Sequence, residues 1–346
     1  MNDFPTARLA VIGLGMATKP HLEALEQLRG RVEVSGGMNR TRAKADAVAA
    51  AHGWRVFDDI EQIAGDPGTD GVILATPPDQ RLEIVETLAR AGKHILLEKP
   101  IERTLAAAER IVAICERHGV TLGVVFQQRM RPAGQRLRAL LNEGRLGTLA
   151  LVRVDVPWWR DQSYYDQPGR GSYARDGGGV LISQAIHTLD LMGSMTPPVR
   201  AVQAMTATTR LHRMEAEDFA TAGLTFTGGA VGAITATTAN FPGGQESITV
   251  AGTLGTAHLR GGELTVNWQD GRSESLGQAG GTGGGADPMA FPCDWHRDII
   301  ADFADAIHNG TLPAISGREA LRVHRLIDAI TRSAAEGRRI EMPEGD

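Results

Sequence analysis

The segment RLAVIGLGMATKPHLEALEQL, residues 8–28, decides how the rest of the chain is interpreted. Its apolar run, residues 9–12, is typical of a strand that is buried on both faces. Gly13 and Gly15 follow, and glycine there permits a tight turn and a close approach of the backbone to a ligand. A helical pattern then begins, with Thr18 as the expected N-cap and Pro20 in the first turn. This arrangement predicts an anion site, because unpaired N–H groups and the helix dipole both favour negative charge.

The pattern departs from the dinucleotide-binding fingerprint at its third position. That fingerprint has glycine or alanine where the helix packs closely on the strand, and this chain has Thr18, directly after Ala17. Strands and helices of about a dozen residues nevertheless alternate from here to Phe126, which indicates a doubly wound parallel sheet. Ligands of such sheets bind beyond the carboxyl ends of the strands. The expected pyrophosphate contacts are Gly13, Gly15, Met16 and Ala17.

Length and composition bound the class of protein. The chain has 346 residues, which exceeds one typical domain, and its net charge of −5 argues against nucleic acid or a membrane surface as the main partner. No apolar run approaches the roughly 18 residues of a membrane span, and no signal peptide is recognisable. Cys115 and Cys293 form no metal-type pair, so no metal site is expected and a cytoplasmic location is the default.

The end of the second expected strand, residues 32–37, indicates which dinucleotide binds. A dinucleotide fold normally places Asp or Glu there for the ribose 2′-hydroxyl, but this chain has Asn39, followed by Arg40 and Arg42. A carboxylate would repel a 2′-phosphate, whereas an amide beside guanidinium groups would bind one. We therefore expect NADP to be preferred over NAD; the alternative is a solvated basic start of the next helix.

Two further strand ends carry candidate chemistry. The run 72–75 leads into Thr76 and Pro77, and the run 94–97 leads into Glu98 and Lys99, before Pro100. We expect these residues to line one crevice with the glycine turn. A lysine beside an oxidised nicotinamide is suited to proton transfer to or from a hydroxyl, because the neighbouring positive charge favours the neutral amine. The alternative for Lys99 is a lysine at an exposed strand end.

Beyond Phe126 the pattern changes from alternating strands and helices to strands that follow one another. Such runs indicate a mixed or antiparallel sheet. We therefore expect a dinucleotide-binding domain over residues 1–126 and a second α/β domain with a large open sheet over residues 127–346. The glycine cluster at 277–285 is expected to be a mobile loop. The expected strands are 149–156, 199–209, 219–226, 230–239, 246–251 and 263–268, and the expected helices are 132–143, 180–193, 295–309 and 317–336.

One helix of the second domain carries a candidate acid–base group. In residues 177–190, GGGVLISQAIHTLD, the spacing predicts that Ser183 and His187 share a polar stripe, with Asp190 one turn beyond. A histidine there is available for proton transfer at neutral pH. The preceding glycines would let a substrate approach the start of the helix. A purely structural histidine is the alternative.

Taken together, these motifs resemble the Gfo/Idh/MocA oxidoreductases over nearly the whole chain. The resemblance rests on the glycine turn with His21, on Ala75-Thr76-Pro77, on Glu98-Lys99-Pro100, and on the glycine run that leads to His187 and Asp190. It implies an N-terminal Rossmann domain and a C-terminal domain whose open sheet often joins subunits, so a homo-dimer or homo-tetramer is expected. It also implies hydride transfer between NAD or NADP and a secondary alcohol of a sugar, polyol or nucleotide sugar, with Lys99 and His187 in proton transfer.

Three positions depart from the family pattern. Ser183 stands where the family often has Asp or Asn, Pro78 replaces the Asn of Thr-Pro-Asn, and Thr18 replaces the third glycine. The Ser183 and Thr18 departures keep one alternative open, a dinucleotide-sensing regulatory protein without turnover. A separate alternative keeps the enzyme class but changes the substrate to a dihydrodiol or similar alcohol.

The segment PWWRDQSYY, residues 157–165, is similar to a Trp-Tyr-Arg…Tyr-Tyr segment of the sugar and nucleotide-sugar dehydrogenases in this family. Aromatic faces stack on sugars, and arginine binds a carboxylate or phosphate, so Trp159, Arg160 and Tyr165 are expected to bind substrate. A core or subunit-contact cluster is the alternative. Arg129 and Arg131 are further candidates for substrate contact; the alternative is that both are surface charges.

Overall fold

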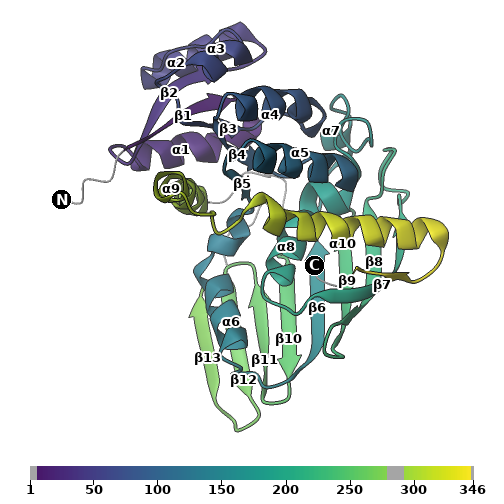
Figure 1. Cartoon of the computed structure of the whole chain (residues 1–346). Helices are drawn as coiled ribbons and strands as arrows, with labels where there is room; N and C mark the ends of the chain where they lie inside the picture. Colours follow the sequence, from purple (N-terminus) through teal and green to yellow (C-terminus); the bar gives the residue numbers. More distant parts are fainter. Residues whose placement is uncertain (1–5, 279–291, 344–346) are drawn as a thin grey trace. The chain divides into compact units, whose positions relative to one another are not determined.

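A computed structural model describes residues 6–278 and 292–343 of the chain. The chain forms two compact units (Figure 1). The first unit extends to Val125 and includes the later segment Pro292–Leu321, whereas the second unit begins at Phe126 and resumes at Arg322. The sequence analysis placed all residues after 126 in the second domain and did not anticipate the return of 292–321 to the first unit. Most of the glycine cluster at 277–285 lies outside the described residues.

The first unit is built on a five-stranded parallel sheet, which confirms the predicted doubly wound fold. The strand order is β2-β1-β3-β4-β5, so β1 lies between the second and third strands of the sequence. The carboxyl ends of all five strands therefore lie along one edge. The strands are β1 (Ala7–Ile12), β2 (Val32–Met38), β3 (Gly71–Leu74), β4 (His94–Glu98) and β5 (Leu122–Val125).

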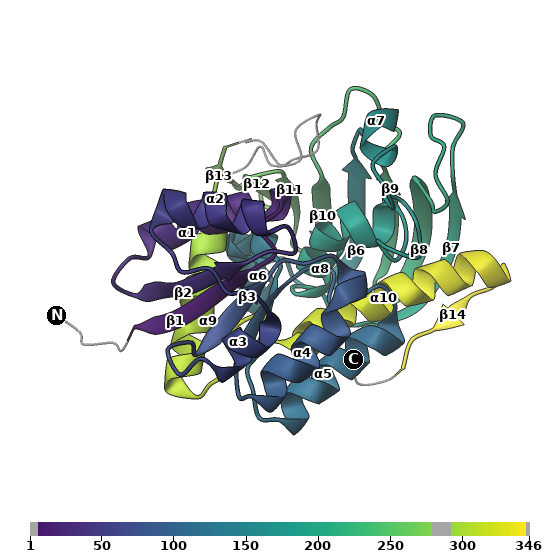
Figure 2. The ribbon, with the colours of Figure 1, turned by 90° about the horizontal axis from the view of Figure 1, so that it is seen from above.

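Helices cover both faces of this sheet (Figures 1 and 2). One face carries α1 (Lys19–Gln27) and α9 (Asp294–Asn309), and the other carries α4 (Arg81–Arg90) and α5 (Leu105–Arg117). α9 belongs to this unit because its Phe303 packs on β5, where a Cβ at Gly123 would lie only 3.0 Å from the Phe303 ring. The remaining helices are α2 (Arg42–His52), the unpredicted α3 (Ile60–Gly65), and the 3₁₀ turns η1 (Met16–Thr18) and η2 (Pro78–Gln80).

The start of α1 differs from its prediction in one detail. Thr18 occupies the N-cap position, but its side chain does not cap the helix. Its Oγ1 donates a hydrogen bond of 2.6 Å to the carbonyl oxygen of Gly13 instead. Thr18 therefore closes the glycine turn on itself, which is a role that glycine or alanine at this position would not fulfil.

The second unit contains a large mixed sheet, as predicted, and this sheet has nine strands. Its order is β13-β12-β11-β10-β6-β9-β8-β7-β14, and the β6–β9 pair is parallel while the other pairs are antiparallel. The sequence analysis missed β11, β13 and β14. The strands are β6 (Leu149–Pro157), β7 (Val199–Ala207), β8 (Phe219–Phe226), β9 (Val231–Thr237), β10 (Ser247–Gly252), β11 (Gly255–Arg260), β12 (Glu263–Trp268), β13 (Ser273–Gly277) and β14 (Ile340–Glu341).

Helices lie on one face of this large sheet (Figure 1). They are α6 (Pro132–Asn142), α8 (Ile186–Gly193) and the part of α10 (Gly317–Glu336) that follows Leu321. Along β6, Val152, Val154 and Val156 are buried beneath them, while the alternating Arg153 and Asp155 are exposed. The opposite face of the sheet is therefore open to solvent.

Within the residues that the structure describes, none of the helices combines the length and apolarity needed to cross a membrane.

Candidate active site

The glycine turn brings two strand ends of the first unit together. Gly13 has a φ of +91°, and a Cβ there would lie 2.8 Å from the carbonyl group of Ala75. Gly13 is therefore required because the β1 turn packs directly on the turn after β3. Gly15 differs: apart from its two chain neighbours, no residue of the described chain has an atom within 4 Å of its would-be Cβ. Gly15, followed by Met16 and Ala17 in η1, thus keeps backbone open at the start of α1, where an anion would bind.

Asn39 closes the end of β2 against the same turn. Its Oδ1 accepts a hydrogen bond of 3.1 Å from the Leu14 N–H, and its Nδ2 donates to the carbonyl of Thr41 at 3.2 Å. Arg40 beside it is exposed. Arg42 pairs with Asp46 and Asp58, so its guanidinium already has two carboxylate partners at the start of α2.

Arg81, which the sequence analysis missed, connects the two turns that carry Thr76 and Lys99. Its guanidinium is fully buried and donates to the carbonyl of Thr76 at 3.0 and 2.6 Å and to that of Glu98 at 2.5 Å. It also donates to the carbonyl of Pro100. Burial lowers the pKa of Arg81 to about 10, which leaves it charged at neutral pH. One signal could have revealed it: Arg81 continues the buried stripe of Val85, Leu88 and Ala89 on α4.

Glu98 faces inward and supports the Lys99 turn. Its Oε1 accepts a 2.7 Å hydrogen bond from His21 Nε2, and its Oε2 accepts the Lys99 N–H at 3.1 Å. Burial alone would raise the pKa of Glu98, but the His21 hydrogen bond and the nearby charges of His21, His296 and Lys99 lower it overall. The carboxylate that was expected to contact the cofactor is thus held by His21. Lys99 itself is half-buried, and the Lys99–Pro100 peptide is cis.

A third side chain, His296 on α9, stands beside this pair. Its Nε2 lies 4.0 Å from Glu98 Oε1, and its ring packs edge-on against the His21 ring with centroids 4.8 Å apart. These two histidines and the carboxylate are the residue types that bind metals, with ligand atoms within 4.8 Å of one another. His21 and Glu98 are already hydrogen bonded to each other at 2.7 Å, so we interpret the group as a hydrogen-bonded support.

In the second unit, the helix that carries His187 begins irregularly. Leu181–Ala185 forms a π-helical turn, η4, before α8. Because a π turn adds a residue, the four-residue spacing of Ser183 and His187 does not by itself place them on one face. Ser183 is half-buried, whereas His187 is buried and lies edge-on to Phe126 with ring centroids 6.0 Å apart.

Gly179, the last glycine before this helix, does not leave the space that was expected for a substrate. A Cβ at Gly179 would lie 1.7 Å from the carbonyl oxygen of Glu217. The space beside Gly179 is therefore filled by the backbone of Glu217, not kept open for a substrate.

Arg129 and Arg131 are buried, which excludes the alternative that they are surface charges. Arg129, in η3 (Gln127–Met130), forms a two-pronged ion pair with Asp190 of α8, with N···O distances of 2.7 and 2.6 Å. Arg131 pairs with Glu246 at 2.6 Å. Both pairs hold elements of the second unit together.

The aromatic segment divides between the interior and the surface. Trp159 is half-buried, and its ring packs against His212 and the exposed Phe241 with centroid distances of 5.7 and 5.4 Å. Arg160 is buried, and its guanidinium carbon lies 5.7 Å from the centre of the Tyr164 ring. Tyr165 in α7 (Gln162–Tyr165) is buried; its hydroxyl contacts Thr238 Oγ1 at 2.6 Å, and burial raises its pKa.

The expected site residues thus fall into two groups. The cofactor residues and Lys99 belong to the first unit, and the substrate residues and His187 belong to the second.

Comparison with protein families matches both units. Residues 7–126 match the family described as "Oxidoreductase family, NAD-binding Rossmann fold", and residues 135–258 match the "GFO/IDH/MocA C-terminal domain".

Similar proteins cover almost the full length of the chain. A solved structure of the WlbA dehydrogenase from Bordetella pertussis, in complex with NADH and UDP-GlcNAcA, is 31% identical, with a TM-score of 0.84 over 98% of this chain and 99% of that one. The D-apiose dehydrogenase of Paraburkholderia graminis is 29% identical over 96% of this chain and 89% of its own. The inositol 2-dehydrogenase of Rhizobium meliloti is 27% identical over 97% and 99%, respectively.

Proposed function

Because this chain belongs to the Gfo/Idh/MocA family of NAD(P)-dependent oxidoreductases, we propose that it oxidises or forms a secondary alcohol of a sugar, polyol or nucleotide sugar. The observation that carries the proposal is the construction of one edge of the first unit. There Gly13 packs on the Thr76 turn, and Arg81 joins that turn to the one that bears Lys99. Three strand ends are thus held together where a nicotinamide cofactor of this fold binds.

The residues present fit a dinucleotide. Gly15 leaves the backbone open at the first turn, and the Thr76 hydroxyl is buried without a hydrogen-bond partner among the described residues. The proposed contacts are Gly13, Gly15, Met16, Ala17, Asn39, Arg40, Thr76, Pro77 and the turn of Glu98 and Lys99. When bound, the nicotinamide supplies the hydride acceptor or donor.

We propose NADP as the preferred form. Asn39 brings no carboxylate to the end of β2, and the exposed Arg40 beside it can pair with a 2′-phosphate. Arg42 contributes less, because Asp46 and Asp58 already neutralise it.

Lys99 and His187 are the proposed proton-handling groups. One takes the hydroxyl proton as the alcohol is oxidised, and the other donates a hydrogen bond that orients the same oxygen. Both tasks suit the two side chains, because a neutral amine or imidazole accepts a proton and its protonated form donates. Ser183 contributes a neutral hydroxyl at the position where the family often has Asp or Asn, so no carboxylate at this position assists the proton transfer.

Side chains of the second unit and the named relatives both indicate the class of substrate. The half-buried Trp159 offers an aromatic face to a sugar ring, and Arg160 offers a positive charge. Arg129 and Tyr165, also expected at the substrate, are committed to Asp190 and Thr238, so we assign them to holding the site. Relatives named as D-apiose and inositol dehydrogenases, and a relative bound to UDP-GlcNAcA, favour a polyhydroxylated substrate.

We also propose that the chain self-associates as a dimer or tetramer through the open face of the nine-stranded sheet, on which Arg153 and Asp155 lie.

The test is turnover of a panel of sugars, polyols and nucleotide sugars, followed at 340 nm with NAD and with NADP. We expect activity with at least one compound and a higher kcat/KM with NADP. Lys99→Met and His187→Ala should each lower kcat by about 100-fold or more, because each removes a group that handles the proton. Lys44→Met on the exposed side of α2 is the matched control. If both variants keep wild-type turnover, the assignment is wrong.

A further inference from the structure

Two consecutive acidic residues, Glu217 and Asp218, lie directly before β8 in the second unit, and both are buried. Successive side chains of an extended segment point in opposite directions. Glu217 and Asp218 can therefore each contact a different segment of the chain. The hydrogen bonds of the two carboxylates show that they do.

Glu217 holds the segment that leads into the helix of His187. Its Oε2 accepts the Gly179 N–H at 3.1 Å, and its Oε1 accepts the Leu181 N–H at 3.1 Å. Its own carbonyl accepts the Val180 N–H at 2.8 Å. These N–H groups come from the glycine run and the start of η4, and the turn of a helix start leaves such donors without partners inside the helix. Glu217 therefore fixes where the helix of Ser183 and His187 begins.

The backbones of Gly179 and Glu217 are in close contact. Gly179 packs so closely on the Glu217 backbone that no side chain can be accommodated. A backbone contact combined with two carboxylate hydrogen bonds defines the position of the helix start more tightly than a side-chain cap alone.

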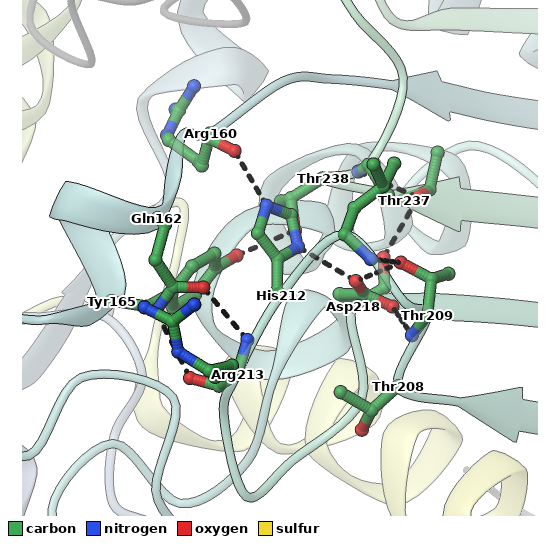
Figure 3. Close-up of polar contacts among 12 residues, drawn as sticks. Arg160, Gln162, Tyr165, Thr208, Thr209, His212, Arg213, Asp218, Thr237 and Thr238 are labelled. Atoms are coloured by element: carbon green, nitrogen blue, oxygen red, sulfur yellow. Dashed lines mark hydrogen bonds and ion pairs between the residues drawn. The ribbon is translucent and has the colours of Figure 1, made fainter.

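Asp218 holds the aromatic segment through His212 (Figure 3). Asp218 Oδ2 lies 2.7 Å from His212 Nδ1, and His212 Nε2 lies 2.7 Å from the carbonyl oxygen of Arg160. The Arg160 N–H in turn donates to the carbonyl of Thr238 at 2.9 Å. Both backbone polar groups of Arg160 are thus held, and the His212 ring also packs against Trp159.

His212 and Asp218 form a buried pair with a full set of hydrogen bonds. A carbonyl oxygen only accepts, so His212 Nε2 carries a proton. Asp218 also accepts from the Thr209 N–H at 2.7 Å and from Thr209 Oγ1 at 2.6 Å. Both side chains of the pair are fully buried, so a change that breaks one of these hydrogen bonds leaves a buried polar group without a partner.

We propose that Glu217 and Asp218 form a positioning pair for the dehydrogenase reaction. Glu217 places the helix of the proton-handling His187, and Asp218, through His212, places Trp159 and Arg160 against the substrate. This inference rests on the proposed function. Neither carboxylate contacts the substrate; each acts through the backbone of another segment.

The isosteric amides test the two roles separately. In Glu217→Gln one acceptor oxygen becomes an NH₂ group that faces a backbone N–H, so the start of the His187 helix is loosened; we expect kcat to fall about tenfold with little change in the substrate KM. In Asp218→Asn one oxygen becomes an NH₂ group, so the hydrogen bonds to His212 and Thr209 cannot all be kept; we expect the KM to rise about tenfold with little change in kcat. Thr209→Val removes one hydrogen bond to Asp218 and should raise KM in the same direction by less.

Asp270→Asn, on an exposed hairpin where Asp270 pairs with Arg272, is the matched control and should behave like the wild type. If the two carboxylates only stabilised the fold, both variants would have a lower thermal midpoint of unfolding, but the effect on kcat would not separate from the effect on KM. Equal changes in kcat and KM in both variants, or none in either, would therefore overturn the proposal.

Hydrogen–deuterium exchange separates this inference from the proposed function, because it needs no turnover. We expect Asp218→Asn to raise amide exchange in residues 158–162 only, and Glu217→Gln to raise it in residues 179–184 only. If the wild type oxidises no compound of the panel but this pattern appears, the proposed function fails and the positioning roles stand. Increased exchange in both segments of either variant, or in neither, contradicts the positioning roles.

Discussion

Arg81 shows how much of the first unit depends on one side chain. Its guanidinium serves the carbonyls of Thr76, Glu98 and Pro100 at once, and methionine at this position would leave these acceptors without a donor. Since a buried polar group without a partner costs about 1–3 kcal/mol, we expect Arg81→Met to lower the free energy of unfolding by about 2–4 kcal/mol. It should also weaken NADPH binding. Urea unfolding and NADPH fluorescence titration measure the two effects.

Arg81→Lys keeps the charge but presents a single ammonium, which cannot span both turns. We expect it to recover part of the stability and little of the NADPH affinity. Arg90→Met, at the exposed end of the same helix, is the control. Wild-type unfolding of Arg81→Met would show that the two turns hold together without the guanidinium.

The residues at the strand ends could be predicted because their chemistry is local. Glycine turns, the Thr-Pro turn and Glu-Lys-Pro each mark the end of an apolar run, so the sequence alone places Gly13, Thr76 and Lys99 at strand ends, where the structure has them. The contacts that hold each unit together could not be predicted. His21 is 77 residues from its partner Glu98, and in the second unit Gly179 is 38 residues from Glu217. Hydrogen bonds across such separations leave no periodic pattern in a single sequence.

At the scale of elements, α9 brings a buried histidine into the first unit. Burial and the charge of His21 lower the pKa of His296 from an ordinary value of 6.5 to about 3, although the Glu98 carboxylate opposes the shift. The folded state therefore resists protonation of His296, whereas the unfolded chain accepts the proton below about pH 6.5. The free energy of unfolding is thus expected to decrease as the pH falls below 7. His296 contributes at most about 1.4 kcal/mol to this decrease for each pH unit.

We expect His296→Gln to flatten the pH dependence of the free energy of unfolding between pH 7 and pH 5. Glu98, whose pKa is also lowered, contributes its own loss at more acidic pH, below the ordinary value of 4.5 for glutamate. His308→Gln, at the exposed last turn of α9, should leave the slope unchanged. Urea unfolding at several pH values measures this, and an unaltered slope in His296→Gln would show that His296 is protonated in the folded protein.

Long elements could be predicted and short ones could not. α9 and α10 have a sustained apolar period, and β8 and β12 alternate clearly, so their predicted bounds were close to those observed. β13 is an exposed edge strand, and β14 has two residues; each forms because a neighbouring strand offers backbone partners. Such pairing depends on the tertiary structure more than on residue preference. The π turn at Leu181–Ala185 was missed for a related reason, since its first residue is hydrogen bonded to Glu217, 36 residues further along the chain.

At the scale of the whole molecule, the large sheet has one face that its own helices leave open. Two apolar side chains of this face are about half exposed: Met205 on β7 at 55% and Val231 on β9 at 50%. Cross-strand neighbours point to the same side, and Met205 pairs with Thr221 as Val231 does with Thr225, so both lie on one face with these threonines. Exposed apolar and small side chains over several strands are suited to a flat, self-complementary contact between copies.

We therefore expect the wild type to sediment as a dimer or tetramer at micromolar concentration, and Val231→Arg to sediment as a monomer. β9 is central in the strand order, so the new charge falls inside any contact of about 800 Å² per partner and has no counter-charge there. Because Val231 is half exposed in a single copy, arginine fits at this position without disturbing the core, and circular dichroism should be unchanged. Ala51→Arg, on the exposed side of α2, is the control and should leave the assembly intact. Analytical ultracentrifugation distinguishes the states; a monomeric wild type, or an assembly that survives Val231→Arg, would place the contact on another surface or exclude it.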